Sequence, residues 1–473
     1  MAEPLSLSGW LLAQFLPWAC GAVWVRWLLL RTGRCNLGLI LGHGFFLGIF
    51  LATLLLRLWD VAGLQLAFAG PAALLGALGV AGVLLQLRSE AAPGPVTAAA
   101  PRWHYLLAAV VLALLGWRYL TLGQELWLWP LYAWDAWMNW APKAIVWFHL
   151  GEMVDYVKPY DWLTAAADDY TLGNRQAWNY PVTVPLIQLW SMLGAGTWDH
   201  GGIYFAWLFA PLALGLALFG HLRLAGVSLA WSCVALYLLL SLPYLNVHTV
   251  LAGYADIWVA AAFALGVCAL SEWQRERRWQ FAVLWLVMAL LCTQLKVPGL
   301  ILGLILLACG LRAWLSLPPL AELGAALVLV VGALALVALR VSVDLPYLGH
   351  VSLAFDRMEI GRIGAFEPAL HPVGGVFAQT FLVMTNWHLL GYLLPLVLLY
   401  ALWRKKLLRY PGADVLAVIL GVCFVTGVFL FTGHYTQALN FVTLNRALLY
   451  PVPALVFVCC LHLAARPPGG ARA

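Results

Sequence analysis

Long apolar runs alternate with short polar stretches along almost the whole chain. A helix that spans a bilayer needs about 20 apolar residues, and the pattern predicts thirteen such segments. They cover residues 10–30, 36–56, 62–87, 103–121, 201–220, 225–245, 251–270, 279–295, 299–316, 322–341, 376–402, 413–432 and 446–465. We therefore expect an all-α, polytopic integral membrane protein with about 13 transmembrane helices. The pair across 279–316 is either two short helices or one long broken helix.

Basic residues are concentrated in every second loop between these segments. They are Arg31, Arg34, Arg88, Arg102, Arg223, Arg275, Arg277, Arg278, Arg312, Arg404, Lys405, Lys406, Arg409, Arg466 and Arg472. Lys and Arg in short loops favour the cytoplasm. The intervals 122–200, 246–250, 342–375 and 433–445 are then external. The pattern favours a bacterial cytoplasmic (inner) membrane, with these intervals facing the periplasm or exterior.

The polar interval at 88–102, rich in Ala, Pro and Gly, is typical of a linker. We expect an N-terminal three-helix membrane unit with this linker over 1–102, a transmembrane core over 103–465 and a cytoplasmic tail over 466–473. The external interval 122–200 is too short to bury a sizeable core of its own. We expect short surface helices there, with Trp and Tyr at the headgroup level.

The composition supports a membrane protein and excludes several other classes. The chain has 473 residues, of which 64% are hydrophobic and 10% charged, whereas soluble domains carry about 25% charged residues. The net charge of +6 is distributed by loop and gives no support to nucleic-acid binding. All nine cysteines lie in or beside apolar segments without a CxxC pair, so neither a disulfide framework nor a cysteine metal site is expected.

A carboxylate among tryptophans opens the large external interval and is the first candidate for chemistry. In a helix, Asp135, Asn139 and Lys143 would lie on one face at i, i+4 and i+8. A carboxylate can accept a proton and a lysine can bind phosphate, while rings stack on sugars. The neighbouring rings are Trp134, Trp137 and Trp140. The alternative is an interfacial loop with a solvated Asp and anchoring tryptophans.

Three further charged residues lie near the predicted outer ends of helices. Asp256 stands near the start of the seventh segment, either facing a cavity or partner or simply favoured by the helix dipole. Lys296 and Arg446 lie on the side that is poor in cations. There they would bind an anionic headgroup or pyrophosphate, or they would snorkel to the interface.

The segment 175–182 supplies a fourth set, with Arg175 and the Tyr180-Pro181 pair. It would either border the substrate site or form a turn into a surface helix. The histidines lack HExxH spacing, and no P-loop, GxSxG or strand-preceded GxGxxG is present. No nucleotide site is expected. A divalent cation is neither required nor excluded, and no metal ligands are assigned.

These motifs together resemble those of the GT-C superfamily of membrane glycosyltransferases, in the branch with protein mannosyltransferases and the aminoarabinose transferase of lipid A. The likeness covers about 103–465. It includes the Trp-Asp-Ala-Trp run with Lys143, the Tyr180-Pro181 pair, the Gly-Tyr-Ala-Asp run that ends at Asp256, and Asn445-Arg446. The resemblance implies sugar transfer from a polyprenyl-phosphate donor on the outer face, with Asp135 as the catalytic acid residue. Members of that family usually place the catalytic loop after their first helix, whereas three extra predicted helices precede it here.

The expected function is an inverting-type transfer of a sugar to a cell-envelope glycan, lipid or protein. Asp135 would be the general base, while Lys143, Lys296 and Arg446 would hold the donor phosphate. Asp256 would orient the acceptor or help a divalent cation, and the tryptophans with Tyr180 would shape the sugar pocket. The alternatives are a polysaccharide polymerase or ligase, a transporter or flippase of lipid-linked sugars, and a non-catalytic scaffold.

Overall fold

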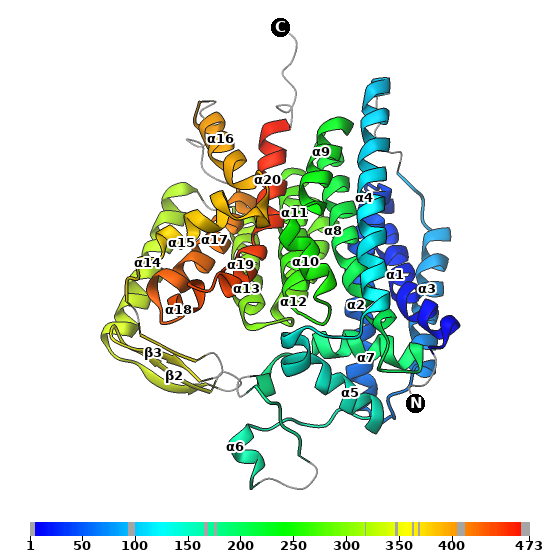
Figure 1. Cartoon of the computed structure of the whole chain (residues 1–473). Coiled ribbons are helices and arrows are strands. Elements are labelled where there is room, and N and C mark those ends of the chain that lie inside the picture. Colours follow the sequence, from blue (N-terminus) through cyan, green and yellow to red (C-terminus); the bar gives the residue numbers. More distant parts are fainter. Residues whose placement is uncertain are drawn as a thin grey trace.

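The computed structural model describes residues 5–92, 100–164, 169–174, 177–316, 318–345, 349–361, 364–367, 369–403 and 412–464. Within these ranges the protein is almost entirely helical, with one small sheet, and the long helices run side by side (Figure 1). The prediction of a mostly helical chain is therefore confirmed.

Eight helical segments of the described chain are long and apolar enough to cross a membrane. They are α1 (Leu7–Leu30), α2 (Leu37–Val61), α3 (Ala69–Leu87), α4 (Arg102–Leu128), Gly201–Leu224 with α8 (Phe205–Leu224), α11 (Asp256–Glu276), α13 (Val297–Leu315) and α17 (Ala413–Phe431). Two bent pairs bring the number to as many as ten. They are α9 (Leu229–Leu240) with α10 (Pro243–Val250), bent by 55°, and α19 (Val442–Leu449) with α20 (Val452–Ala464), bent by 48°.

The predicted number of thirteen spans is not confirmed. The other three predicted segments correspond to α12 (Trp279–Thr293), α14 (Pro319–Ala338) and the region of α15 (Gly374–Ala378) and α16 (Leu390–Trp403), none of which is among the ten. At 15 residues, α12 is about 22 Å long, which is short of the roughly 30 Å hydrocarbon core. The segment 279–316 is thus two helices that meet near Lys296.

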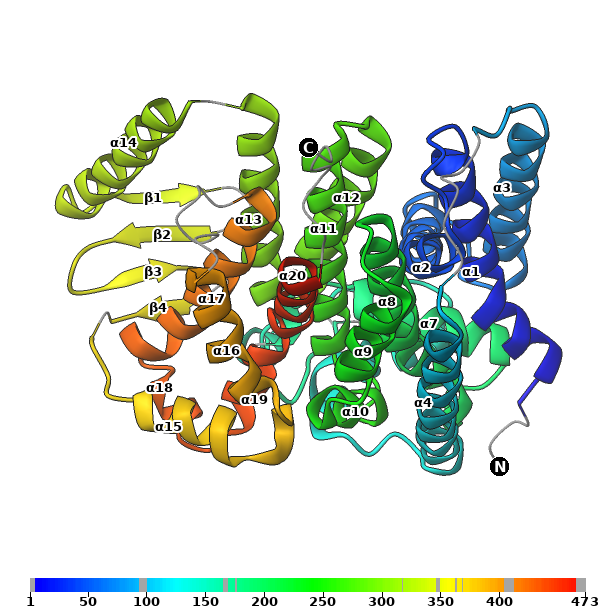
Figure 2. The same ribbon diagram turned by 90° about the horizontal axis from the view of Figure 1, so that it is seen from above.

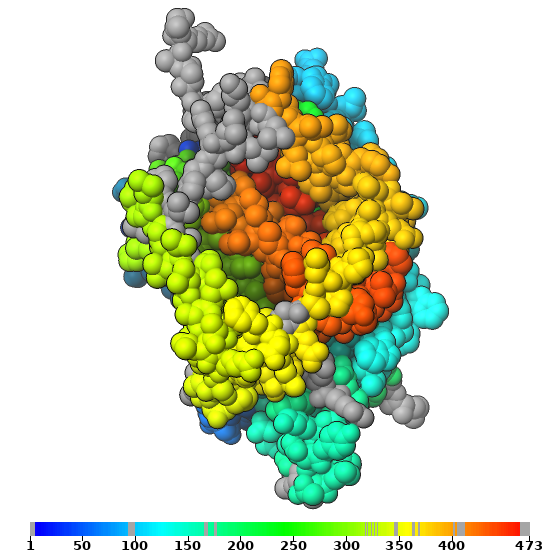
Figure 3. Space-filling view, turned by 90° about the vertical axis from the view of Figure 1, so that its left-hand side faces the viewer, coloured from blue at the N-terminus to red at the C-terminus, as the bar shows by residue number. Residues whose placement is uncertain are grey.

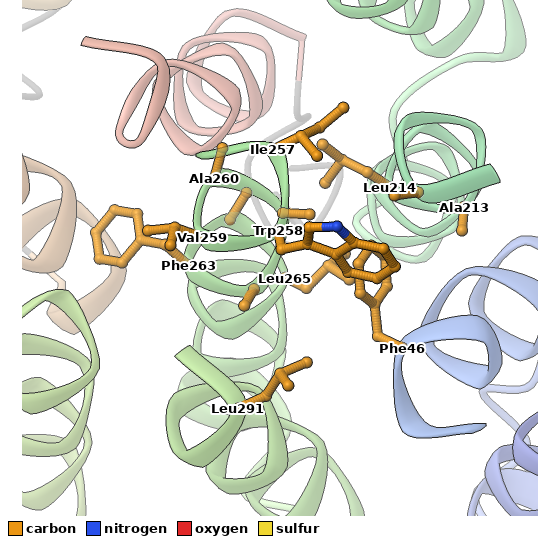
Figure 4. Packing of buried hydrophobic residues seen from close by; sticks show 14 of the residues in the cluster. Phe46, Ala213, Leu214, Ile257, Trp258, Val259, Ala260, Phe263, Leu265 and Leu291 are labelled. Carbon is orange, nitrogen blue, oxygen red and sulfur yellow. The ribbon is translucent and has the colours of Figure 1, made fainter. Parts of the chain in front are cut away.

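Helix α11 forms the centre of the bundle. It is apolar around its circumference, as expected of a helix enclosed on all sides, and its hydrophobic residues are buried. The ring of Trp258 stacks on Phe45 of α2 and meets Phe46 and Trp207 edge-on, with centroids 5.4–5.9 Å apart. Figure 4 shows Trp258 beside Phe46. This packing fixes the height and rotation of the first turn of α11, which carries Asp256.

Of the three N-terminal helices, α1 and α2 pack directly on the rest of the bundle, while α3 packs on α1 and α2 (Figure 2). Trp190 of α7 (Thr183–Ala195) donates its indole N–H to the Ala13 carbonyl at 2.8 Å, and Gln14 donates to Ser191 at 3.2 Å. His43 of α2 and His221 of α8 lie with their Nε2 atoms 2.8 Å apart in the interior. The domain boundary at residue 102 stays a prediction, and these contacts give the N-terminal unit a large interface with the core.

The segment after α4 gathers at one end of the bundle, together with the sheet (Figure 1). It contains η1 (Ala136–Trp140), α5 (Ala141–Leu150), α6 (Pro159–Trp162), η2 (Ala177–Asn179), α7 and η3 (Gly201–Tyr204). Almost every residue of α7 is buried. The expectation of helices lying on the membrane surface is therefore wrong for α7, because this helix packs between α1, α2 and α5.

The interval 342–366 contains four antiparallel strands in the order β1-β2-β3-β4. They are β1 (Ser342–Leu345), β2 (Gly349–Leu353), β3 (Met358–Ile360) and β4 (Gly364–Phe366). Val343 pairs with Val351, and Ser352 pairs with Glu359. The remaining short elements are η4 (Gln379–Val383), η5 (Thr385–Trp387) and α18 (Tyr435–Ala438). The sheet was not predicted, and it is the one departure from an all-α chain among the described residues.

Candidate functional site

Four charged side chains from distant parts of the chain meet at the end of the bundle that carries the 129–200 segment. Asp135 directly precedes η1 and Asp256 is the first residue of α11. Lys296 directly precedes α13 and Arg446 lies in α19. Arg446 bridges the two carboxylates, which joins residues 311 positions apart. The structure therefore brings together four of the predicted site residues, and we call them the outer cluster after the outer helix ends at which the sequence predicts them.

Asp256 is the most heavily bonded member of the outer cluster. Its Oδ1 accepts from Lys296 Nζ at 2.9 Å and from the Tyr450 hydroxyl, and its Oδ2 accepts from Arg446 Nε and Nη2 at 3.2 and 2.7 Å. The side chain is fully buried. Burying a charge is costly unless it is paired and hydrogen-bonded. Four donors meet that requirement and leave Asp256 firmly fixed.

Asp135 has fewer partners. Its Oδ2 accepts from Arg446 Nη2 and its Oδ1 accepts from Asn139 Nδ2 at 2.7 Å. Asn174 in turn donates to Asn139 Oδ1 at 2.7 Å. The expected i, i+4 contact between Asp135 and Asn139 is present, although η1 is a π-helix rather than an α-helix. Single π turns occur frequently at functional sites.

A glycine allows η1 to approach the start of α11. Gly253 has φ +83°, and a Cβ there would come within 2.6 Å of the Ala136 Cβ. The next residue, Tyr254, accepts the backbone N–H of Asp135 on its hydroxyl at 3.2 Å. Its ring lies 4.8 Å from the guanidinium carbon of Arg446. This tyrosine therefore touches both Asp135 and Arg446 and keeps them in register.

Lys143 does not join the outer cluster. Its Nζ donates to the carbonyls of Trp178 and Tyr180 at 2.8 and 3.3 Å and lies 5.3 Å from the Tyr156 ring centroid. Burial lowers the pKa of Lys143 to about 8. The lysine thus fastens the 177–180 segment onto α5. Its predicted role in phosphate binding stays a prediction, and these contacts favour a positioning role.

The predicted aromatic pocket divides into two pairs. Trp140 is fully buried and packs on Tyr180 with ring centroids 5.1 Å apart. Burial and the negative charges of Asp135 and Asp256 raise the pKa of the Tyr180 hydroxyl, although Arg446 opposes this. By contrast, Trp134 and Trp137 are 62% and 41% exposed. Those two rings lie at the surface, where they are suited to a membrane interface or an incoming substrate. Arg175 lies outside the described residues.

Sequence reasoning missed three residues at this site. Tyr450 stands four residues after Arg446, a spacing that places both on one face of a helix, and this signal was available in the sequence. Tyr254 belongs to the Gly-Tyr-Ala-Asp run, but no role was predicted for it. His248 is fully buried, and neither ring nitrogen has a hydrogen-bond partner among the described residues. Its ring lies 4.9 Å from that of Tyr244 and 5.7 Å from that of Tyr254.

The described residues do not form a metal centre. No group of three or more His, Cys, Asp or Glu side chains is placed to hold an ion in the part of the chain that the structure describes. The oxygens of both clustered carboxylates already accept from Arg446, Lys296 or neutral donors. Donors already neutralise both carboxylates, so the proposed function assigns no role to a metal.

The outer cluster retains donors that could bind an anion. Two carboxylates and two cations cancel in formal charge. Lys296 Nζ, which carries three protons, donates to Asp256 alone among the described residues. Arg446 Nη1 donates to no residue that the structure describes. The side chains of Lys296 and Arg446 are 14% and 17% exposed, so both remain within reach of a ligand.

Comparisons with protein-family models, with curated proteins and with solved structures found no match for this chain. The class that the fold defines is an integral membrane protein, and its activity has to be argued from the outer cluster itself.

Proposed function

We propose that the chain is a glycosyltransferase that moves a sugar from a polyprenyl-phosphate donor to an acceptor hydroxyl of the cell envelope. The observation that carries this proposal is the outer cluster. Two acids and two cations from four distant segments meet at one end of a membrane bundle, beside buried rings. Such a set supplies a base for a hydroxyl and cations for a leaving phosphate.

In the proposed reaction the acceptor oxygen attacks the anomeric carbon of the donor sugar. The bond between that carbon and the phosphate oxygen breaks, and the phosphate leaves with the electron pair. Asp135 takes the proton of the acceptor hydroxyl. Lys296 and Arg446 stabilise the negative charge on the departing polyprenyl phosphate, since both retain unused N–H donors.

One face of the bundle offers a place for the tail of a lipid-linked substrate. Figure 3 shows a recess between α14 and the α15–α16 region, with α17 as its floor. The two helices that form its walls, α14 and α16, expose many leucine and valine side chains, such as Leu327, Val331 and Leu399. In a bilayer this recess opens sideways to lipid, which allows an isoprenoid tail to lie against the protein while its phosphate approaches the helix ends.

A transporter or flippase of lipid-linked sugars remains the main alternative. Transporters usually bind their cargo near the membrane midplane, between repeated halves. Here the charged site lies at the end of the bundle, at the first residue of α11. A polysaccharide polymerase or ligase would carry out related chemistry on another donor.

The proposal is tested by measuring lipid-linked sugars and surface glycans in a strain that lacks the gene. We expect the polyprenyl-phosphate sugar to accumulate and one sugar to disappear from a surface glycan, lipid or protein. The wild-type gene should restore both, as should a control with Asp155→Asn, which changes an exposed residue of the same loop. Asp135→Asn should restore neither. Unchanged lipid-linked sugars and envelope glycans in the deletion strain would contradict the proposal.

A further inference from the structure

We propose that Arg446 is a latch on Asp135, and that the phosphate of the donor opens it. Asp135 then becomes available to the acceptor only after the donor has bound. This inference rests on the proposed function and adds an order to its steps.

The structure holds Asp135 in an engaged state. Its Oδ2 accepts from Arg446 Nη2 and its Oδ1 accepts from Asn139, and the side chain is only 8% exposed. Charge-assisted hydrogen bonds of this kind are the strong ones. With a cation on Oδ2, an amide on Oδ1 and little of the side chain exposed, Asp135 is poorly accessible to an incoming hydroxyl until Arg446 lets go.

The partners of the two carboxylates are unequal, which decides which one is released. If Arg446 turns away, Asp256 keeps Lys296 and Tyr450 as donors. Among the side chains that the structure describes, Asp135 keeps only Asn139 as a donor. Asp256 is thus the fixed anchor, and Asp135 is the partner that is set free. In this arrangement Asp256 acts as a positioning residue, because it keeps the two cations in place without touching the reacting atoms.

The phosphate is a suitable group to open the latch. Guanidinium groups bind phosphate oxygens through two parallel N–H donors. Arg446 has Nη1 unused by described residues, while its Nη2 is shared between the two acids. A phosphate that engages Nη1 and Nη2 takes the place of Asp135 on Nη2. Meanwhile Nε remains on Asp256 at 3.2 Å and the Tyr254 ring stays under the guanidinium.

The test uses the full-length protein in nanodiscs and a membrane-soluble carbodiimide. Carbodiimides modify carboxyl groups in apolar surroundings that have no cationic partner, and peptide mass spectrometry locates the adduct. We expect labelling of Asp135 to rise severalfold when polyprenyl monophosphate is added, and not with neutral polyprenol. Asp256 should stay unlabelled in every condition. In Arg446→Gln, Asp135 should be labelled strongly with or without the phosphate.

Binding of polyprenyl monophosphate to the same samples is measured in parallel by native mass spectrometry. If the lipid phosphate binds but labelling of Asp135 is unchanged or falls, the latch is wrong and the proposed function stands. If the protein binds polyprenyl monophosphate no better than polyprenol, the proposed function is wrong as well. Both of these contradicting outcomes are measured on the wild-type chain, so neither depends on the folding of Arg446→Gln.

Discussion

The two ends of α11 both carry acids and bases, but they treat these charges differently. At the end opposite the outer cluster, Glu272 pairs with Arg275 at 3.1 Å and Glu276 pairs with Arg34 at 2.6 Å. These two arginines are 37% and 31% exposed. At the Asp256 end, no member of the outer cluster exceeds 17%.

Solvent-exposed ion pairs at a helix end carry little energetic cost, whereas buried ion pairs carry a cost that something else has to offset. Long arginine side chains that reach water stay hydrated, so an ion pair there changes the free energy of folding only slightly. A closed cluster carries a large desolvation cost, and apolar residues of similar volume are often at least as stable. Stability alone therefore does not account for the outer cluster, whereas the proposed binding and transfer of a charged substrate would.

The two ends of α11 are predicted to face opposite sides of the membrane, and this is the largest difference between them. Glu152 is exposed in the segment that also carries Asp135, and Glu90 is exposed two residues after Arg88 of a basic loop. In intact cells, a membrane-impermeant thiol reagent should label Glu152→Cys, whereas Glu90→Cys should react only after permeabilisation. The unmodified chain, with its nine native cysteines, gives the background. The reverse pattern would place the outer cluster in the cytoplasm and remove the basis for a lipid-phosphate donor outside.

Removing the base should have the largest effect on activity. Asp135→Asn keeps the shape of the side chain and its contact with Asn139 but cannot accept the proton. Loss of a general base lowers the transfer rate by about 10²–10⁴-fold. Sugar transfer in membranes measures the rate, and the elution volume of the protein in detergent checks its folding. A folded Asn variant with wild-type turnover would assign the base elsewhere.

Removing the anchor should affect stability more at one end of α11 than at the other. Asp256→Ala leaves Lys296 and Arg446 buried with one carboxylate fewer, and breaking a buried pair costs about 3–5 kcal/mol. Glu276→Ala breaks a partly solvated pair and should cost no more than about 1 kcal/mol. Thermal unfolding of both variants in the same detergent measures the difference. Equal losses would show that burial of the outer cluster has no energetic consequence.

Weakening the cations should alter donor use more than acceptor use. Hydrogen bonds to charged groups contribute about 1.5–3 kcal/mol, so Lys296→Gln should raise the donor concentration needed for half-maximal rate by about tenfold or more. Arg446→Lys should also be impaired, because a point charge cannot reproduce a two-donor phosphate contact. Arg275→Gln, at the opposite end of α11, is the matched control. Unchanged donor dependence in Lys296→Gln and Arg446→Lys would show that Lys296 and Arg446 have only a structural role.

The smallest effect concerns Lys143. Burial lowers its pKa to about 8 in the folded chain, against about 10.4 in an unfolded one. Between these values the unfolded state binds more protons, so the contribution of Lys143 to stability rises with pH through this window. Relative to Lys143→Met, the wild type should gain on the order of 1–2 kcal/mol between pH 7 and pH 9.5. Thermal unfolding at the two pH values measures this, and a constant difference would contradict it.

The sequence was most informative about the long helices. Apolar length alone predicted α1, α2, α8, α13 and α17 to within several residues at each end, because a bilayer requires such length whatever the tertiary packing. It was less informative where packing decides the outcome. α7 lies in the interval that was predicted to form short surface helices, yet it is buried because α1, α2 and α5 cover it.

The strands of 342–366 carried a usable signal that the apolar count ignored. Polar and apolar residues alternate in Ser342-Val343-Asp344-Leu345 and again in His350-Val351-Ser352-Leu353, and this period of two is typical of strands.

The sequence alone predicted which charged side chains belong to the candidate site. They are Asp135, Asp256, Lys296 and Arg446. Their pairing was not predictable, because contacts across 40 to 311 residues depend on how the helices pack.

The most direct test of the central claim is release of polyprenyl phosphate by the purified protein. Lipid-linked sugar and envelope acceptors from the deletion strain supply both substrates, whichever sugar the donor carries. Wild-type protein in nanodiscs should convert the accumulated donor to free polyprenyl phosphate and transfer its sugar to the envelope fraction. Asp135→Asn, equally folded, should release about 10²–10⁴-fold less. Equal release by both proteins, or none by the wild type, would contradict the assignment of the outer cluster as a glycosyltransferase site.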